Sequence, residues 1–394
     1  MLLATIPQEQ VSYKDVLRSY APSNITELQH DYGASCATYE ALADKVTHKA
    51  GVIIISGIGC TLCVRNDTLT VVPGKTYAAQ KEGPVTLYRG VHGITSIILL
   101  ADKKGSITLD AIAWCDSQDI RLSILDYRGT CIQSFSSTRA DARLRRLQYA
   151  APAAAISGEL VRRKLEGQRT TLVAHPELPG SNEAIHLLDD ALAWLLLPEL
   201  PTRFSDVDWL RTFEGRAADA YFSAWEGLPI RWDKAVTKTI PPHWKRVTKR
   251  GSPLSKNHGA RYAINPGQAI LNYAYALLES QVRQSLNAAG FDSACGFLHS
   301  DVLDRDSLVY DMMELYRPMV DDLVLCLLKK ITFTKGDYMT TTDGTFKWNP
   351  QLSRYIAASC RLPQKEVDAG TTWLRSRLLS VQTSPQARCC GGTE

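Results

Sequence analysis

The chain has 394 residues and a formal net charge of +4, from 45 Lys and Arg against 41 Asp and Glu. This near balance excludes a uniformly basic nucleic-acid binder, so any charge-based function must come from local clusters. Hydrophobic content of 45% with 22% charged residues is that of a folded globular protein and excludes a long disordered or coiled-coil chain. The ten cysteines are scattered through a chain long enough to be stabilised by its core, so we expect reduced thiols.

Residues 1–50 form an N-terminal extension whose role the sequence does not indicate, with one helix expected over Cys36–Val46. The opening MLLATIPQEQ has no basic leader, and its apolar run is too short for a signal peptide. The longest uncharged stretches are also shorter than the roughly 20 apolar residues of a membrane-spanning helix. We therefore expect a soluble, cytoplasmic protein that does not contact a membrane.

Residues 51–138 predict a small β-rich domain. Short β-prone runs such as VIIIS, TLTVV and SIILL alternate with turn sequences such as GIG, RNDT and PGK. A short helix is expected over Ser106–Gln118, followed by a buried strand in RLSILDYRG.

Residues 139–394 show apolar residues at helical spacing, interrupted by Pro and Gly. The sequence thus predicts an α+β protein, with a small N-terminal β-rich domain followed by a larger, mostly α-helical domain.

Carboxylates beside apolar helix faces are the first candidates for catalytic or metal-binding residues. Glu214 borders the apolar face of a helix predicted in DWLRTFEGRAADAYFSAW, and an unpaired buried carboxylate costs several kcal/mol. It must therefore find a metal, a proton or a cation, and an ion pair with Arg211 or Arg216 is the plainer interpretation.

A second helix is predicted from Ser307 to about Lys330, bent at Pro318. Asp311 and Glu314 lie three residues apart beside its buried stripe, and His299 precedes it in GFLHSD. Two carboxylates and an imidazole suit Mg²⁺ or Mn²⁺ in phosphodiester chemistry. A solvated acidic pair and a structural histidine are the plainer alternatives.

A local basic segment indicates a nucleic-acid substrate. Residues 234–278 contain eight Lys or Arg and no Asp or Glu, and His243, Trp244, His258 and Tyr262 lie among the cations. Such a segment is typical of a surface that follows phosphates and stacks bases, and a solvated loop is the alternative. The candidate DNA-binding cations are Lys245, Arg246, Lys249, Arg250 and Arg261.

Cys60 and Cys63 form an isolated CxxC. No second pair at the spacing of a zinc site accompanies it. Residues three apart on a strand point to opposite faces, so we interpret the two as ordinary thiols.

Several of these segments together resemble CRISPR-associated protein one, the integrase of CRISPR spacer acquisition. The long run that begins NPGQAILNYAYALLES and continues through GFLHSD, DMMELYRP and MVDDLVL resembles that family's signature core. FEGRAADAYF resembles its other metal-binding helix, RRLQYAA and KLEGQ resemble segments between the motifs, and LSRYIAASCRL resembles its C-terminal helix. The resemblance extends from about Gly51 to Leu362.

The resemblance implies roles for individual residues. Glu214, His299 and Glu314 would hold the metal, Asp311 would support the site, and Arg317 would lie near the phosphate. Tyr273 and Tyr275 of LNYAY occupy positions where family members place aromatic hydroxyls near DNA. Independently of the resemblance, Asn265, Pro266 and Gln268 are typical of an N-cap, a first-turn proline and a capping-box partner.

The resemblance also implies an activity and partners. The expected function is a metal-dependent DNA integrase and endonuclease that joins 3′-hydroxyl ends of short DNA to a CRISPR repeat by transesterification. Homodimers formed through the β-rich domain would be bridged, two at a time, by CRISPR-associated protein two. A casposon-type transposase with the same site and a catalytically silent DNA-binding scaffold are the alternatives.

Overall fold

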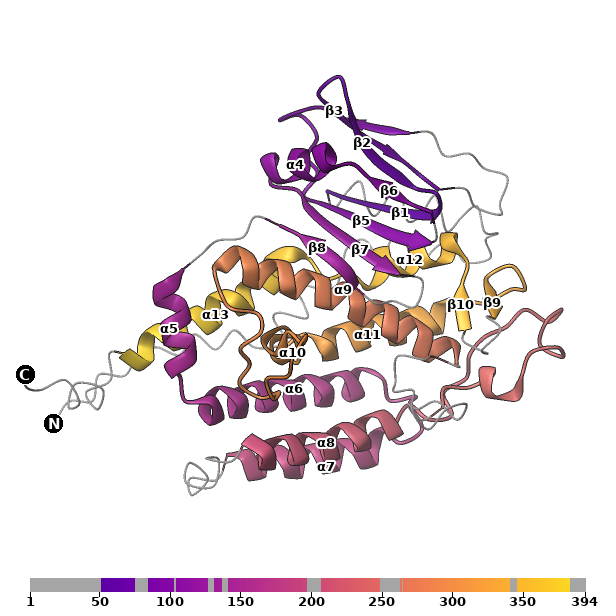
Figure 1. Cartoon of the computed structure of the whole chain (residues 1–394). Helices are drawn as coiled ribbons and strands as arrows, with labels where there is room; N and C mark the ends of the chain where they lie inside the picture. Colours follow the sequence, from indigo (N-terminus) through magenta and orange to yellow (C-terminus); the bar gives the residue numbers. More distant parts are fainter. Residues whose placement is uncertain are drawn as a thin grey trace, which may run out of the picture.

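The structure is a computed structural model that describes residues 51–74, 84–102, 104–126, 131–136, 141–196, 207–248, 263, 265–340 and 346–382. The N-terminal extension and its expected helix lie outside the described residues, as does the predicted domain boundary at 138. Two four-stranded sheets are followed by a mostly helical region, which confirms the predicted fold class (Figure 1).

The first sheet has the strand order β1-β5-β7-β8. Its strands are β1 (Val52–Ile58), β5 (Ser96–Asp102), β7 (Arg121–Asp126) and β8 (Cys131–Phe135). β1, β5 and β7 are parallel, and β8 is antiparallel to β7. Both faces of a parallel sheet are usually buried, which explains the unbroken apolar run of β1. Val52 and Ile54 pack into the helical core, whereas Ile53 and Ile55 pack toward the second sheet.

The second sheet has the order β4-β3-β2-β6. Its strands are β2 (Thr61–Arg65), β3 (Thr68–Val72), β4 (Val85–Leu87) and β6 (Ser106–Ile107), and helix α4 (Leu109–Ser117) packs against it. The β2–β3 hairpin turns at Asn66 and Asp67, both with positive φ, as the sequence RNDT predicts. The predicted helix over Ser106–Gln118 starts later, at the Thr108 N-cap, because Ser106 and Ile107 pair with β2.

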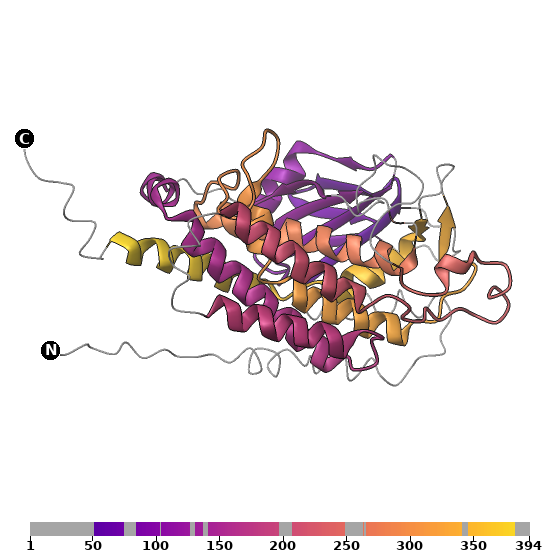
Figure 2. The same ribbon diagram turned by 90° about the horizontal axis from the view of Figure 1, so that it is seen from below.

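The helical region surrounds one buried helix, α9 (Pro266–Ala289), which contacts β7, β8, α10, α11, α12 and α13. The other elements are α5 (Ala142–Ala150), α6 (Ala153–Ala174), α7 (Ser181–Leu195), α8 (Val207–Ser223), η3 (Pro242–Trp244), α10 (Ser307–Met313), α11 (Arg317–Lys330), β9 (Tyr338–Thr340), β10 (Phe346–Trp348), α12 (Pro350–Cys360) and α13 (Gln364–Gln382). Helices α6, α7 and α8 pack side by side, on the side away from the sheets (Figures 1 and 2).

The predicted start of α9 is confirmed: Asn265 is the N-cap and accepts from the Gly267 N–H at 2.9 Å. The prediction of a single helix from Ser307 to Lys330 is wrong, because the helix is interrupted between Met313 and Arg317. Pro318 lies in the first turn of α11, where its missing N–H costs no intrahelical bond. Within the described residues, no helix is long and apolar enough to cross a bilayer.

Candidate active site

Asp311 organises the loop that carries His299. Its fully buried carboxylate accepts from the backbone N–H groups of Phe297, Leu298 and His299 at 2.5, 2.9 and 2.9 Å. The Nδ1 atom of His299 lies 2.6 Å from the same carboxylate. Because Nδ1 is occupied by Asp311, the free ligand position of the imidazole is Nε2. This is the arrangement in which a carboxylate fixes the tautomer and orientation of a metal-binding histidine.

Glu214 and Glu314 converge on one cation from distant parts of the chain. The Lys164 ammonium, on α6, forms ion pairs with Glu214 on α8 and, at 2.5 Å, with Glu314 in the turn between α10 and α11. Arg317 adds a second cation, with Nη1 3.0 Å from Oε1 of Glu314. Lys164 and Glu314 are only 4% and 2% exposed, so these charges interact with little screening by water.

The charges hold one another ionised. Burial disfavours the charged form of Glu314, but Arg317 and Lys164 more than offset it and lower the pKa of this carboxyl. Burial likewise disfavours the charged form of Lys164, but Glu314 and Glu214 raise the pKa of its ammonium above the usual value. Two carboxylates, those of Glu214 and Glu314, therefore face one cation position.

The side chains around this position are of the types that bind a divalent metal ion, although their donors are not gathered around one point. Oε2 of Glu314 is buried and has no hydrogen-bond partner among the described residues, although the Lys164 ammonium lies nearby as an ion pair. Two carboxylates and an imidazole are a donor set for Mg²⁺ or Mn²⁺. In the structure, the ligand atoms of Glu214, His299 and Glu314 do not all lie within 4.8 Å of one another. Lys164 lies between the two carboxylates instead.

Arg317 is held over the ring of Tyr275, with its guanidinium carbon 5.2 Å from the ring centroid. The Tyr275 hydroxyl lies 2.6 Å from the carboxylate of buried Asp321. Tyr273 and Tyr275 are only 2% and 8% exposed, so their rings pack in the core around α9. A contact of their hydroxyls with DNA stays a prediction.

A family model described as CRISPR associated protein Cas1 matches residues 53–358. This chain belongs to the Cas1 family. The matched stretch runs from β1 into α12 and contains every residue of the candidate site. An endonuclease Cas1 from Methanospirillum hungatei is 26% identical over 302 residues, which cover 74% of this chain and 81% of the relative.

Two solved structures show the same fold. A casposase bound to its integration product has a TM-score of 0.66 at 19% identity, covering 84% of this chain and 92% of the casposase. A chain of a Cas6-RT-Cas1–Cas2 complex has a TM-score of 0.61 at 18% identity, covering 84% of this chain and 35% of that chain. Membership of the Cas1 family confirms the resemblance predicted from the sequence.

Lys164 is the site residue that sequence reasoning missed. Glu214 was expected to pair with Arg211 or Arg216, but Arg211 pairs with Asp208, and the partner of Glu214 is Lys164. A signal was present in the Cas1-like segment KLEGQ. Lys164 lies four residues from Leu160 and from Gln168, both fully buried, so it is a cation on the core-facing side of α6.

The basic segment is described in part. Lys245 and Arg246 are exposed, and Lys249, Arg250 and Arg261 lie outside the described residues. Trp244 is 5% exposed and packs against Trp232 and Tyr338, so it is a core residue and not a base-stacking platform. DNA binding by these cations stays a prediction.

Cys60 is buried in the core between the sheets together with Leu62, whereas Cys63 on β2 alternates away from Leu62 and is partly exposed. We expect the double substitution Cys60→Ser and Cys63→Ser to leave bound zinc and strand joining unchanged, with a modest loss of stability from the buried thiol. Metal analysis of purified protein checks this. Stoichiometric zinc lost in the double variant would contradict it.

Asp311→Asn is expected to impair the site by releasing His299. An amide places an N–H donor where the carboxylate accepts, so at least one loop N–H loses its partner, at about 1–3 kcal/mol. We expect a lower melting temperature and a large loss of strand joining. Asp301→Asn is the matched control, because Asp301 is exposed and accepts from Gly296 in the same loop. Equal melting temperatures and equal strand joining in the two variants would refute the role of Asp311 in holding His299.

Proposed function

We propose that this chain is the metal-dependent DNA integrase and endonuclease of CRISPR spacer acquisition, joining 3′-hydroxyl ends of short DNA to a CRISPR repeat by transesterification. The observation that carries the proposal is the convergence of Glu214 and Glu314 on one cation position, beside a histidine oriented by a buried carboxylate. Relatives named as endonucleases of the same family support the reaction class.

In this reaction the DNA 3′ oxygen forms a bond to phosphorus as the bond to the leaving 3′ oxygen of the target strand breaks. The attacking hydroxyl loses a proton and the leaving oxygen gains one, so the number of phosphodiester bonds is conserved. Glu214, His299 and Glu314 would hold Mg²⁺ or Mn²⁺, which would supply positive charge to stabilise the transition state. Asp311 orients His299, while Arg317 provides a fixed cation for the phosphate.

The proposed partners are DNA, a second copy of this chain and CRISPR-associated protein two, with two dimers bridged by that partner in the cytoplasm. The Cas6-RT-Cas1–Cas2 complex, a fold neighbour, supports the last of these. Dimerisation through the β-rich region is proposed from the family resemblance.

The proposal is tested with a labelled duplex and a target that contains a CRISPR repeat. Covalent joining is expected from 3′-hydroxyl ends and is lost when the ends are 3′-dideoxy. Nicking of the target without joining would show a nuclease and contradict the proposed integrase activity. A casposon-type transposase is the second candidate, favoured by the casposase fold neighbour, and sequencing of the joined target sites separates the two.

Charge reversal at Lys245, Arg246, Lys249 and Arg250 is expected to weaken duplex binding and reduce its salt dependence. Each lost phosphate contact lowers the slope of log affinity against log salt by about 0.9. Binding isotherms at several salt concentrations measure this slope. Reversal of Lys365 on α13, an exposed lysine remote in sequence from the basic segment, is the control. An unchanged slope in the quadruple variant would make the segment a solvated loop.

A further inference from the structure

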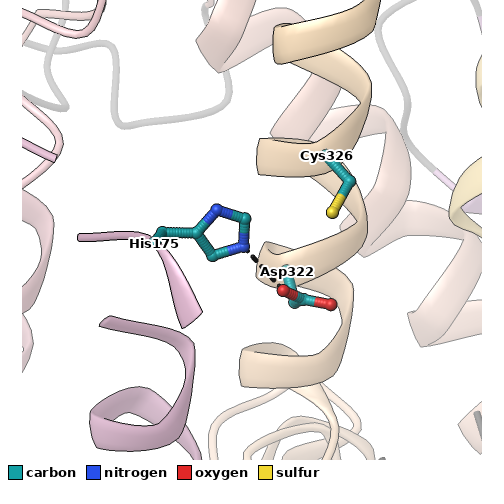
Figure 3. A group of neighbouring side chains, drawn as sticks. All are labelled: His175, Asp322 and Cys326. Atoms are coloured by element: carbon teal, nitrogen blue, oxygen red, sulfur yellow. Dashed lines mark hydrogen bonds and ion pairs between the residues drawn. The ribbon is translucent and has the colours of Figure 1, made fainter. Parts of the chain in front are cut away.

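A second group of metal-ligating side chains lies where α6 ends against α11. His175 is the C-cap of α6, and Asp322 and Cys326 lie four residues apart on α11 (Figure 3). One donor atom from each of the three lies within 4.8 Å of the other two. Residues at i and i+4 share one face of a helix, which is a spacing that metal sites use.

The imidazole is oriented on both sides. Its Nε2 lies 2.6 Å from the Asp322 carboxylate, and the Cys326 thiol is within hydrogen-bonding range of the ring. Its Nδ1 lies 3.2 Å from the carboxylate of Glu177. A carboxylate on the far nitrogen fixes the tautomer that leaves Nε2 for a metal. Lys329 pairs with Glu177 at 2.5 Å and anchors that carboxylate.

We propose that His175, Asp322 and Cys326 form a zinc-binding site, separate from the proposed catalytic centre. A thiolate, an imidazole and a carboxylate are zinc ligands, and the thiolate disfavours Mg²⁺. Bonds of about 2.0–2.3 Å place tetrahedral donors roughly 3.5 Å apart, so only small side-chain movements are needed. Asp322 is 31% exposed, which leaves room for water as the fourth ligand.

Zinc at this site would cross-link α6 and α11, two helices of the proposed active site. α6 carries Lys164 and α11 begins with Arg317, the two cations beside Glu314. The Thr171 hydroxyl already donates to the Pro318 carbonyl at 3.0 Å across the same pair of helices. The site lies near the end of this contact, where α6 terminates.

The competing account is an ion pair without metal. Burial disfavours the imidazolium, but hydrogen bonds to Asp322 and Cys326 raise the pKa of His175 to about 9. A protonated histidine between Asp322 and Glu177 would link the helices by charge alone. The two accounts differ in whether Cys326 becomes a metal-bound thiolate.

Cobalt(II) distinguishes the accounts, because a thiolate bound to cobalt gives a charge-transfer band that oxygen and nitrogen ligands do not give. Full-length, untagged protein is titrated with Co²⁺ in excess Mg²⁺, which occupies sites made of oxygen ligands. The expected result is the band at one equivalent, removed by one equivalent of Zn²⁺. Cys326→Ser should lose the band, and His175→Gln should lose it or weaken it strongly.

Glu177→Gln should lower the cobalt affinity about 10–100-fold while keeping the band, as loss of an outer carboxylate does. Cys326→His should bind zinc again without the band, which separates lost binding from lost folding. Glu314→Gln should bind cobalt unchanged, so failure of the catalytic assignment does not affect this test. The matched thiol controls are Cys63→Ser and the double variant Cys389→Ser, Cys390→Ser. Absence of the band in the wild type, or its loss in a control instead of Cys326→Ser, overturns the proposal.

Discussion

Strand joining by Glu214→Gln or Glu314→Gln protein is expected to fall at least about hundredfold, the scale on which loss of one fixed group that stabilises the transition state acts. Glutamine keeps the size of glutamate but removes its charge and weakens it as a ligand for a hard cation. His299→Ala should have an effect of the same order, because it removes the nitrogen that Asp311 orients. The measurement is covalent joining of a labelled duplex under single-turnover conditions.

The matched control is Glu183→Gln, an exposed glutamate in the first turn of α7. It should join DNA like the wild type. Circular dichroism and melting curves establish that each variant is folded. Near-normal joining by Glu314→Gln in Mn²⁺ would show that Glu314 is not a ligand.

Lys164→Met is expected to destabilise the metal-free protein by roughly 3–5 kcal/mol, the cost of removing one partner from a buried ion pair. The side chain of Glu214 is 20% exposed, so water screens part of the loss and the lower end of that range applies. Mn²⁺ should restore much of the stability, because a divalent cation can take the position between the carboxylates. The measurement is thermal unfolding in chelator and in Mn²⁺.

Lys365→Met is the control, since Lys365 is exposed on α13. Its melting temperature should change little, and Mn²⁺ should shift it as it shifts the wild type. The larger Mn²⁺ shift of Lys164→Met is the specific outcome. Equal shifts in all three proteins would show that the metal does not bind where the ammonium lies.

Local sequence signals predicted much of the fold. The apolar run of β1 and the turn residues Asn66 and Asp67 predicted β structure, and Asn265 with Pro266 predicted the start of α9. These predictions are confirmed because each depends on backbone preferences within a few residues. The break after Met313 was missed because Pro318 is as compatible with the first turn of a new helix as with a bend.

The roles within the site depended on long-range packing. Asp311 and Glu314 were expected to act together from one side of a helix, yet Asp311 holds the His299 loop and Glu314 faces Lys164. The partner of Glu214 is 50 residues away in sequence, beyond any helical periodicity. The surroundings of Tyr275 are likewise set by residues distant in sequence, Asp321 and Arg317.

The central claim is that Glu214, His299 and Glu314 hold a metal ion against the scissile phosphate. The most direct test replaces one non-bridging oxygen of that phosphate by sulfur in a synthetic repeat duplex, with each diastereomer assayed separately. Mg²⁺ prefers oxygen, whereas Mn²⁺ also accepts softer ligands. We expect joining into one diastereomer to fail in Mg²⁺ and to recover in Mn²⁺. Equal joining in the two metals for both diastereomers would contradict metal contact with the phosphate.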